Sequence, residues 1–153
     1  MLSKEYKETT GLPNFILILF VIQFLFFVIY TINNREDKSL IYYSIGTLIL
    51  GALLFFIKLT IKINNQYFEY KMIPFVNRKI LFKDIKAIKV IKISAISDYL
   101  GWGIRYSKKY GWGYITKSDF AIFIEKNNGK KLTFSIKDKD RLNQFLKNLS
   151  YPK

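Results

Sequence analysis

The chain is 153 residues long, which suits one ordinary domain, and it carries a formal net charge of +14. Half of the residues are hydrophobic, which excludes an intrinsically disordered protein. The sequence contains neither Cys nor His, so disulfide scaffolds, thiol nucleophiles, the usual zinc sites and the commonest general base are excluded. We therefore expect a small, basic and unusually apolar protein.

Two apolar runs near the N-terminus contain no charged residue between 13 and 32 or between 40 and 57. As helices with a rise of 1.5 Å per residue they would each be roughly 27 to 30 Å long, which matches a bilayer hydrocarbon core of about 30 Å. Neither run has the polar stripe of a helix in a soluble bundle, and no cleavage site of a signal peptide follows the first run. We therefore predict transmembrane helices at 13–32 and 40–59.

The segments around these helices determine the predicted topology. Residues 33–39 suit a tight external turn between antiparallel helices, and residues 1–12 are expected to form a cytoplasmic tail. Tail and turn carry two basic residues each, so the orientation depends on residues 62–153, which hold 20 Lys or Arg and 7 Asp or Glu. The positive-inside rule then predicts an integral protein of the inner (cytoplasmic) membrane with two spans and both termini in the cytoplasm.

From residue 62 onward the sequence changes to short β-branched and aromatic segments separated by turn signals. Trp102, Ile104 and Tyr106 alternate with smaller or charged residues, as in a strand with two different faces. The Asn-Asn-Gly sequence at 127–129 favours a tight hairpin, because Asn and Gly tolerate positive φ angles. The pattern predicts an antiparallel meander of seven strands at 63–71, 78–82, 85–93, 101–107, 111–116, 120–125 and 131–136.

The last part of the chain changes to a helical period. Four apolar residues between 142 and 149 follow the i, i+3, i+4, i+7 spacing of an amphipathic helix. Asp138 or Asp140 suits the N-cap, and Lys147 suits the helix dipole in the last turn. The sequence thus predicts a membrane-anchored α+β protein, in which a transmembrane helical hairpin precedes a seven-stranded antiparallel β-barrel or sandwich with a C-terminal α-helix.

Seven strands followed by a helix resemble the outline of the pleckstrin homology (PH) fold. The segment 101–115, GWGIRYSKKYGWGYI, is similar to the GWGIR-type segment of bacterial PH-like domains. The hairpin that follows this segment in the family is matched here by Glu125, Lys126, Gly129, Lys130 and Leu132. Many members also carry two N-terminal transmembrane helices directly before the domain. The resemblance covers nearly the whole chain and implies a PH-like domain at 62–153 and a membrane location, but no reaction.

The phosphoinositide site of eukaryotic PH domains does not carry over to this chain. That site needs Lys and Arg spaced across the first two strands and their loop. The corresponding stretch, 70–79, is apolar at 72–76, and its basic residues are Lys71, Arg78 and Lys79. The apolar loop either meets lipid or a partner, or packs back onto the domain, and for so short a run we favour packing.

Basic and aromatic side chains gather around the turn of the hairpin 101–115, and this combination suits a lipid headgroup boundary or a partner surface. The candidate contact residues are Arg105, Lys108, Lys109, Tyr110 and Trp112, together with Arg78 and Lys79. Trp102 and Trp112 could instead belong to the core, which we favour for Trp102. We expect no nucleic-acid ligand, because a tethered domain without a nucleic-acid motif meets headgroups first.

Catalysis is not favoured, because the sequence lacks His and Cys and its carboxylates are scattered. We therefore expect no enzyme activity, cofactor or metal site. We expect an adaptor that binds a protein or peptide partner at the membrane surface, or forms homo-oligomers, aided by weak contact with anionic lipid headgroups. Two other hypotheses are a membrane subunit or immunity-type factor that acts through the helical hairpin, and a lipid-surface sensor.

Overall fold

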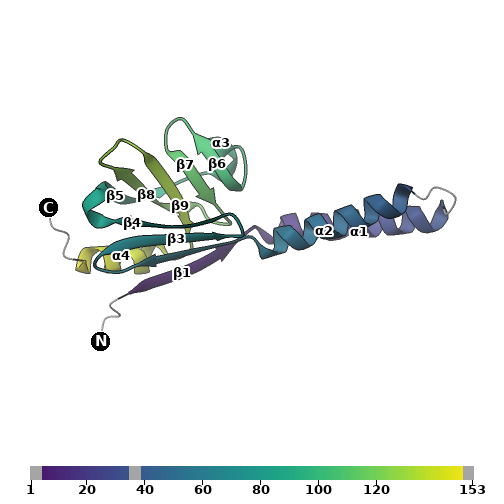
Figure 1. Ribbon diagram of the computed structural model, residues 1–153, viewed down its shortest axis with the longest axis horizontal. Helices are drawn as coiled ribbons and strands as arrows, with labels where there is room; N and C mark the ends of the chain where they lie inside the picture. Colours follow the sequence, from purple (N-terminus) through teal and green to yellow (C-terminus); the bar gives the residue numbers. More distant parts are fainter. Residues whose placement is uncertain (1–4, 35–38, 150–153) are drawn as a thin grey trace. The chain divides into compact units, whose positions relative to one another are not determined.

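The computed structural model describes residues 5–34 and 39–149, and the chain folds as two compact units. One unit, the helical hairpin, consists of residues 12–57. The other, the β domain, joins the N-terminal segment up to Gly11 to the residues from Lys58 onward. Figure 1 shows the elements of each unit. Both ends of the helical hairpin therefore lead into the β domain.

The helical hairpin consists of α1 (Asn14–Asn33) and α2 (Ser39–Phe56), which lie side by side as an antiparallel pair (Figure 1). A polar contact joins them where the hydroxyl oxygens of Thr31 and Ser44 are 3.2 Å apart. Both hydroxyls also donate to backbone carbonyls four residues earlier in their own helices. These polar groups are therefore satisfied within the unit, as an apolar surrounding requires.

The surface of this unit is apolar. None of the residues of α1 is buried, and in α2 only Leu40 is. Both helices are long and apolar enough to cross a membrane, which confirms the two predicted apolar helices, although α2 ends at Phe56 rather than at residue 59. Residues 35–38 of the predicted external turn lie outside the described part of the chain.

The first sheet of the β domain contains four antiparallel strands in chain order. They are β1 (Tyr6–Gly11), β2 (Lys58–Ile63), β3 (Tyr67–Ile73) and β4 (Val76–Leu81). The whole helical hairpin separates β1 from β2 in sequence, yet the two strands pair from Tyr6 opposite Ile63 to Gly11 opposite Lys58. The side chain of Tyr6 is only 1% exposed.

The cytoplasmic tail predicted at 1–12 is therefore corrected, since residues 6–11 form a strand of the β domain. Their sequence, YKETTG, has one large apolar residue and shows no alternation. The domain also begins at Lys58 rather than at residue 62, because Leu59 and Ile61 are buried strand residues of β2. The predicted strand at 63–71 combined the end of β2 with most of β3.

The second sheet contains five strands in the order β5-β8-β9-β7-β6. They are β5 (Ile85–Lys92), β6 (Gly103–Ser107), β7 (Gly111–Ile115), β8 (Phe120–Lys126) and β9 (Lys131–Ile136). The 3-10 helix η1 (Phe82–Asp84) precedes β5, and the short helix α3 (Ala95–Tyr99) connects β5 to β6. All five strand positions agree with the predicted segments to within two residues.

Of the two predicted architectures, a barrel or a sandwich, the structure shows two separate sheets and, over the described residues, no closed barrel, and the predicted seven-stranded antiparallel meander is wrong in topology. The described strands number nine and form two sheets, and β7 pairs with β9 in parallel. The strand β9 lies between β8 and β7, and its residues Thr133 to Ile136 are all buried. A strand that is covered on both faces takes a central position, which a simple meander would not give it.

The core of the β domain lies between the two sheets and is rich in aromatic rings. The Phe134 ring of β9 lies 4.5 Å from the Tyr70 ring of β3 and 4.9 Å from the Phe68 ring, measured between centroids. The Tyr114 ring of β7 stacks on Phe134 at 5.0 Å. Such ring pairs stabilise the packing of the sheets beyond the area that they bury.

The C-terminal helix α4 (Lys139–Asn148) packs against β1, where the Phe145 ring lies 5.7 Å from the Tyr6 ring. The helix confirms the predicted amphipathic segment, and Leu142 is fully buried on its inner face. Of the two capping candidates Asp138 is the N-cap, since its carboxylate accepts a hydrogen bond from the backbone N–H of Arg141 at 2.9 Å.

Candidate functional site

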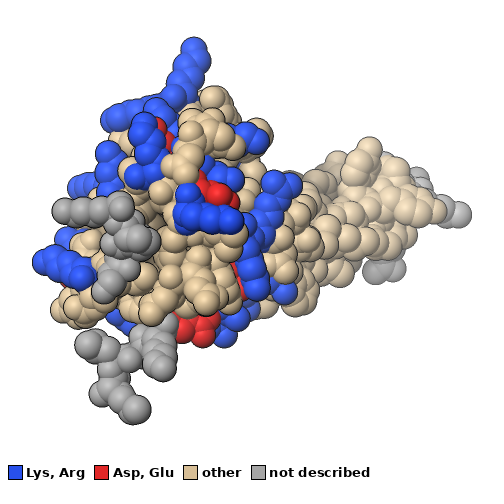
Figure 2. Space-filling view, turned by 60° about the vertical axis from the view of Figure 1, so that its left-hand side comes forward, with Lys and Arg blue, Asp and Glu red and all other residues tan. Residues whose placement is uncertain are grey.

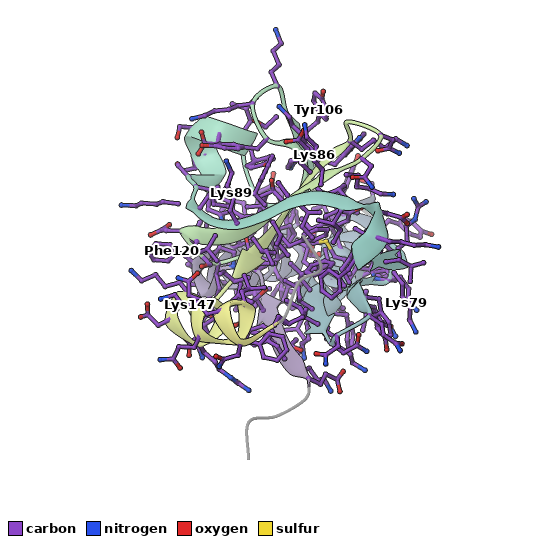
Figure 3. The ribbon with its side chains drawn as sticks, turned by 90° about the vertical axis from the view of Figure 1, so that its left-hand side faces the viewer. Lys79, Lys86, Lys89, Tyr106, Phe120 and Lys147 are labelled. Carbon is purple, nitrogen blue, oxygen red and sulfur yellow. The ribbon has the colours of Figure 1, made fainter. Side chains whose placement is uncertain are left out.

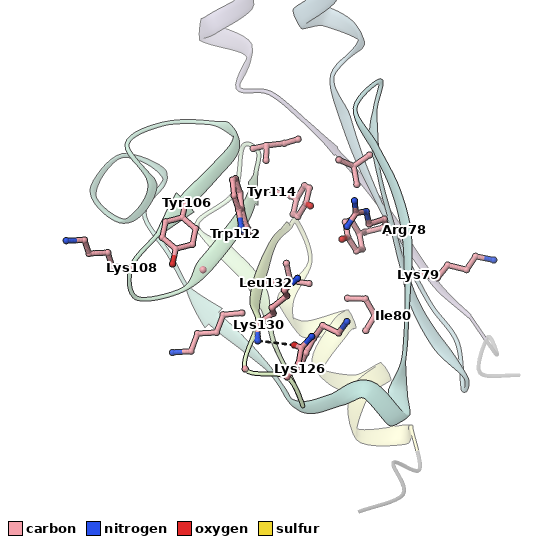
Figure 4. A pocket seen from close by; sticks show the side chains of 17 residues that line it. Arg78, Lys79, Ile80, Tyr106, Lys108, Trp112, Tyr114, Lys126, Lys130 and Leu132 are labelled. Atoms are coloured by element: carbon pink, nitrogen blue, oxygen red, sulfur yellow. Dashed lines mark hydrogen bonds between the residues drawn. The ribbon is translucent and has the colours of Figure 1, made fainter.

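A cleft of about 930 Å³ opens in the β domain between β4 of the first sheet and three parts of the second sheet, namely β6, β7 and the β8–β9 hairpin (Figure 4). Its walls are apolar and aromatic. They are formed by Tyr70, Val76, Ile80, Ile104, Tyr106, Trp112, Tyr114 and Leu132. Apolar walls with a few polar groups are typical of binding sites.

The cleft is also strongly basic. Among the residues that the structure describes, its lining includes no Asp or Glu, whereas its Lys and Arg residues are Arg78, Lys79, Lys108, Lys126, Lys130 and Lys131. In Figure 4 the Lys79 and Lys108 side chains point away from the cleft, and the other labelled cations do not converge on one point. The cleft therefore suits a ligand with separated negative charges better than one compact anion.

Basic residues also occur elsewhere on the β domain. Figure 2 shows Lys and Arg over much of one face, and in Figure 3 Lys79, Lys86 and Lys147 project from separate parts of the domain. Some of these residues have acidic partners, as where Lys86 Nζ lies 2.8 Å from a Glu125 carboxylate oxygen. The cleft differs from this general surface because its cations border an apolar cavity.

The alternation of strand β4 places its residues on two faces. Val76, Arg78 and Ile80 share the face toward the cleft, whereas the Lys79 side chain points away from it (Figure 4). Lys79 Nζ lies 3.8 Å from a Glu69 carboxylate oxygen. Of the two basic residues expected in this segment, Arg78 therefore supplies the charge that faces the cleft.

The candidate residues around the β6–β7 turn lie in different surroundings, and only some of them line the cleft. Lys108 and Trp112 line the cleft, and the Trp112 side chain is 52% exposed. The Arg105 side chain instead donates to the backbone carbonyl of Trp102 at 3.0 Å. Lys109 lies over the ring of Tyr110, with its nitrogen 4.7 Å from the centroid.

Tyr110 and Trp102 pack on the other side of the second sheet. Both contact a buried cluster that contains Tyr99 and Ile115. The Tyr110 ring stacks with the Tyr99 ring at 6.4 Å. The core interpretation of Trp102 therefore agrees with its half-buried position, and Tyr110 does not belong to the cleft.

The basic residues of the β8–β9 hairpin were not predicted to form a site. Lys126, Lys130 and Lys131 flank the Asn-Asn-Gly turn, whose Gly129 has a φ angle of 77°. The KNNGKK sequence was visible as a turn with basic flanks. Its position opposite Arg78 depends on the packing of the two sheets, which no local pattern shows.

Tyr70 does not contribute charge to the cleft at neutral pH. Burial raises the pKa of the Tyr70 hydroxyl, and the hydrogen bond with Tyr114 raises it further. A raised pKa keeps the phenol protonated and neutral. The charge of the cleft therefore comes from Lys and Arg, which are cationic at pH 7.

The apolar loop between β3 and β4 has two parts. Met72 is 1% exposed and belongs to the core, whereas Phe75 at the hairpin tip is 62% exposed. The expected packing onto the domain is therefore correct for Met72 and wrong for Phe75. Ile73 pairs with Lys58, so this tip lies at the end of the sheet where the chain enters the helical hairpin.

The tip of the β6–β7 hairpin lies at the end of β7 that is remote from Gly11. The backbone N–H of Lys117, two residues after β7, donates to the carbonyl of Gly11 at 3.1 Å. The hairpin tip lies beyond Gly111, at the opposite end of β7 and about 13 Å along the strand from Ile115. Lys108 and Lys109 are therefore remote from the residues that connect to the helices.

The described part of the chain offers few side chains that could bind a metal ion or act as a general base. Over residues 5–34 and 39–149, no three side chains from Asp and Glu come together in a way that could hold a metal ion. The cleft offers Lys amines, one guanidinium and phenols, but no carboxylate to act as a general base.

No family model matches the chain, and no curated protein or solved structure matches it either. The similarity of residues 101–115 to PH-like domains therefore stays a prediction. What the protein does has to be inferred from its own residues.

Proposed function

We propose that this chain is a membrane-anchored interaction protein whose β domain binds a negatively charged segment of a protein or peptide partner in the cleft. The observation that carries this proposal is the lining, which combines Arg78 and the lysines of the β8–β9 hairpin with an apolar and aromatic wall and, among the described residues, includes no carboxylate. Complementary charge brings such a partner to the site and selects against wrong partners. The apolar walls supply the contact area that holds it.

The two apolar helices support the membrane anchor. Because Gly11 and Lys58 pair in one sheet, both ends of the helical hairpin lead to the same compact domain. An antiparallel pair of spans has both ends on one side of a bilayer. The excess of Lys and Arg over Asp and Glu in the β domain favours the cytoplasmic side of the inner membrane.

A homo-oligomer is less well supported than a different, acidic partner. The chain carries 25 Lys or Arg and 11 Asp or Glu, so two β domains repel each other at low salt. Weak lipid contact is better supported at the exposed Phe75 than at Lys108 and Lys109. Phe75 lies at the domain end that joins the helices, whereas the two lysines lie at the far end of β7.

The first test concerns the anchor. We expect the full-length protein to stay in the membrane pellet after extraction with alkaline carbonate and with high salt, and to be released by detergent. Carbonate removes proteins that are held by charge, whereas transmembrane helices remain in the bilayer. Release into the carbonate supernatant would show that α1 and α2 do not span the membrane.

The second test concerns the cleft. The full-length protein in nanodiscs of zwitterionic phosphatidylcholine is titrated into a fluorescein-labelled peptide that repeats Glu-Thr-Val-Thr. We expect Arg78→Glu combined with Lys130→Glu to weaken the binding at least about tenfold, because two attractive charges become repulsive. Fluorescence anisotropy measures the dissociation constant.

The matched control combines Lys71→Glu with Lys147→Glu, which changes the net charge equally but at exposed positions outside the cleft. We expect this variant to bind the peptide within about twofold of the wild type at moderate salt, where remote charges are screened. Equal weakening by both double variants would mean that only net charge matters. Absence of binding by the wild type would refute the proposed function.

A further inference from the structure

The strand β4 has one unpaired side. In the first sheet it is the last strand of the order β1-β2-β3-β4, and among the described strands only β3 pairs with it. An edge strand presents alternate backbone N–H and C=O groups that an extended chain can pair with. The strand at the opposite edge of this sheet, β1, packs against α4 through Tyr6 and Phe145.

Most residues of β4 border the cleft. Val76, Arg78, Lys79 and Ile80 all line it. Because the Lys79 side chain points away from the cleft (Figure 4), its backbone is the part that borders the cavity. The backbone edge of β4 is therefore accessible from the same cavity that holds the basic side chains.

The side chains of β4 define what a neighbouring strand would meet. On the cleft face Arg78 lies between Val76 and Ile80, so a cation is flanked by two apolar positions. Side chains of paired strands lie directly opposite each other at about 5 Å. An added strand would match this face if it placed one carboxylate between two apolar residues. One residue of any kind would separate the carboxylate from the apolar residue on each side.

We infer that the partner of the proposed function binds as an extended acidic segment that adds to the β4 edge as a fifth strand. The inference rests on that function and specifies its ligand as a pattern of apolar, any, acidic, any, apolar residues. The carboxylate pairs with Arg78, and the apolar side chains enter the cleft toward Trp112 and Leu132. Main-chain hydrogen bonds supply affinity, and the alternate side chains supply specificity.

The experiment measures hydrogen exchange of the full-length protein in phosphatidylcholine nanodiscs, with and without the Glu-Thr-Val-Thr repeat peptide at saturation. We expect amide exchange in residues 76–81 to slow at least about tenfold, because edge amides become hydrogen-bonded. The amides of β3 already have strands on both sides and serve as the internal control.

Two N-methylated forms of the peptide sharpen the test. N-methylation of every second residue removes the donors on one edge of the extended peptide, and the complementary form removes those on the other edge. We expect one form to lose at least about tenfold in affinity and the other to bind like the parent peptide. Equal affinity of the two forms would overturn strand addition.

The other outcomes separate the inference from the proposed function. Two results overturn the inference and leave the proposed function intact. One is peptide binding without slowed exchange in residues 76–81, and the other is slowing only in β6, the edge strand of the second sheet that lines the cleft. Absence of peptide binding overturns both. Slowed exchange of 76–81 on addition of phosphatidylglycerol to peptide-free nanodiscs would assign the edge to lipid headgroups and also overturn the inference.

Discussion

A fragment that begins at Lys62 is expected to remain unfolded, although it contains all seven segments, from 63–71 to 131–136, that the sequence pattern predicts to be strands. It lacks β1 and nearly all of β2, and with them the buried Tyr6, Leu59 and Ile61. Each such side chain contributes about 1.5 to 3 kcal/mol when buried, and the total stability of a domain is only about 5 to 15 kcal/mol. Circular dichroism and thermal melting would show no cooperative transition.

The matched control replaces residues 12–57 by Asn-Gly. Because Gly11 and Lys58 pair directly, a two-residue loop suffices to join β1 to β2 as a hairpin. We expect this joined β domain to be soluble and to melt cooperatively. A cooperative transition in the fragment, or none in the joined domain, would contradict the assignment of β1 to the domain.

The substitution Gly111→Ala is expected to destabilise the joined β domain by several kcal/mol. The φ angle of Gly111 is 71°, which alone costs an L-residue about 1 to 2 kcal/mol. A Cβ there would also lie 2.3 Å from the carbonyl oxygen and 2.7 Å from the Cβ of Lys131. The start of β7 would have to move away from the start of β9, which disrupts their parallel pairing. Urea unfolding measures the loss.

Gly129→Ala is the control for the backbone conformation. Gly129 has nearly the same φ angle, 77°, but a Cβ there would meet no atom within 4 Å. We expect it to cost about 1 to 2 kcal/mol, which is the conformational term alone. The difference between the two variants therefore measures the close approach of β7 and β9, and equal losses would show that this approach does not limit the space at Gly111.

Features with a strong local pattern could be predicted from the sequence. The apolar helices stand out because an uncharged run of this length is rare outside membranes. The α4 segment combined apolar spacing with a capping Asp138, and the Asn-Asn-Gly turn indicated the β8–β9 hairpin. In each case the residues that determine the element lie within a few positions of one another.

Features that depend on distant partners could not be predicted. β1 is a strand only because β2 lies beside it, and its own sequence buries little besides Tyr6 and Thr10. The parallel pairing of β7 with β9 likewise joins segments that are not neighbours in the chain. Such pairings depend on the packing of the whole domain rather than on local propensity.

The candidate site shows the same division. The basic and aromatic residues at the β6–β7 turn were visible as a cluster, but the sheet places Trp112 at the cleft and Tyr110 on the opposite side, and the Lys108 side chain points away from both. Arg78 was recognised as basic, but not as a residue that faces Lys130 across a cavity. Strand alternation and sheet packing, rather than proximity in sequence, decide which residues act together.

The pairing of β1 with β2 also has a consequence for synthesis. The ribosome makes β1 before both helices, and its partner emerges only after residue 57. The nascent strand must therefore wait until both helices have been synthesised, and until then it is a single strand with both edges open. Completion of the first sheet thus follows the synthesis of the whole helical hairpin.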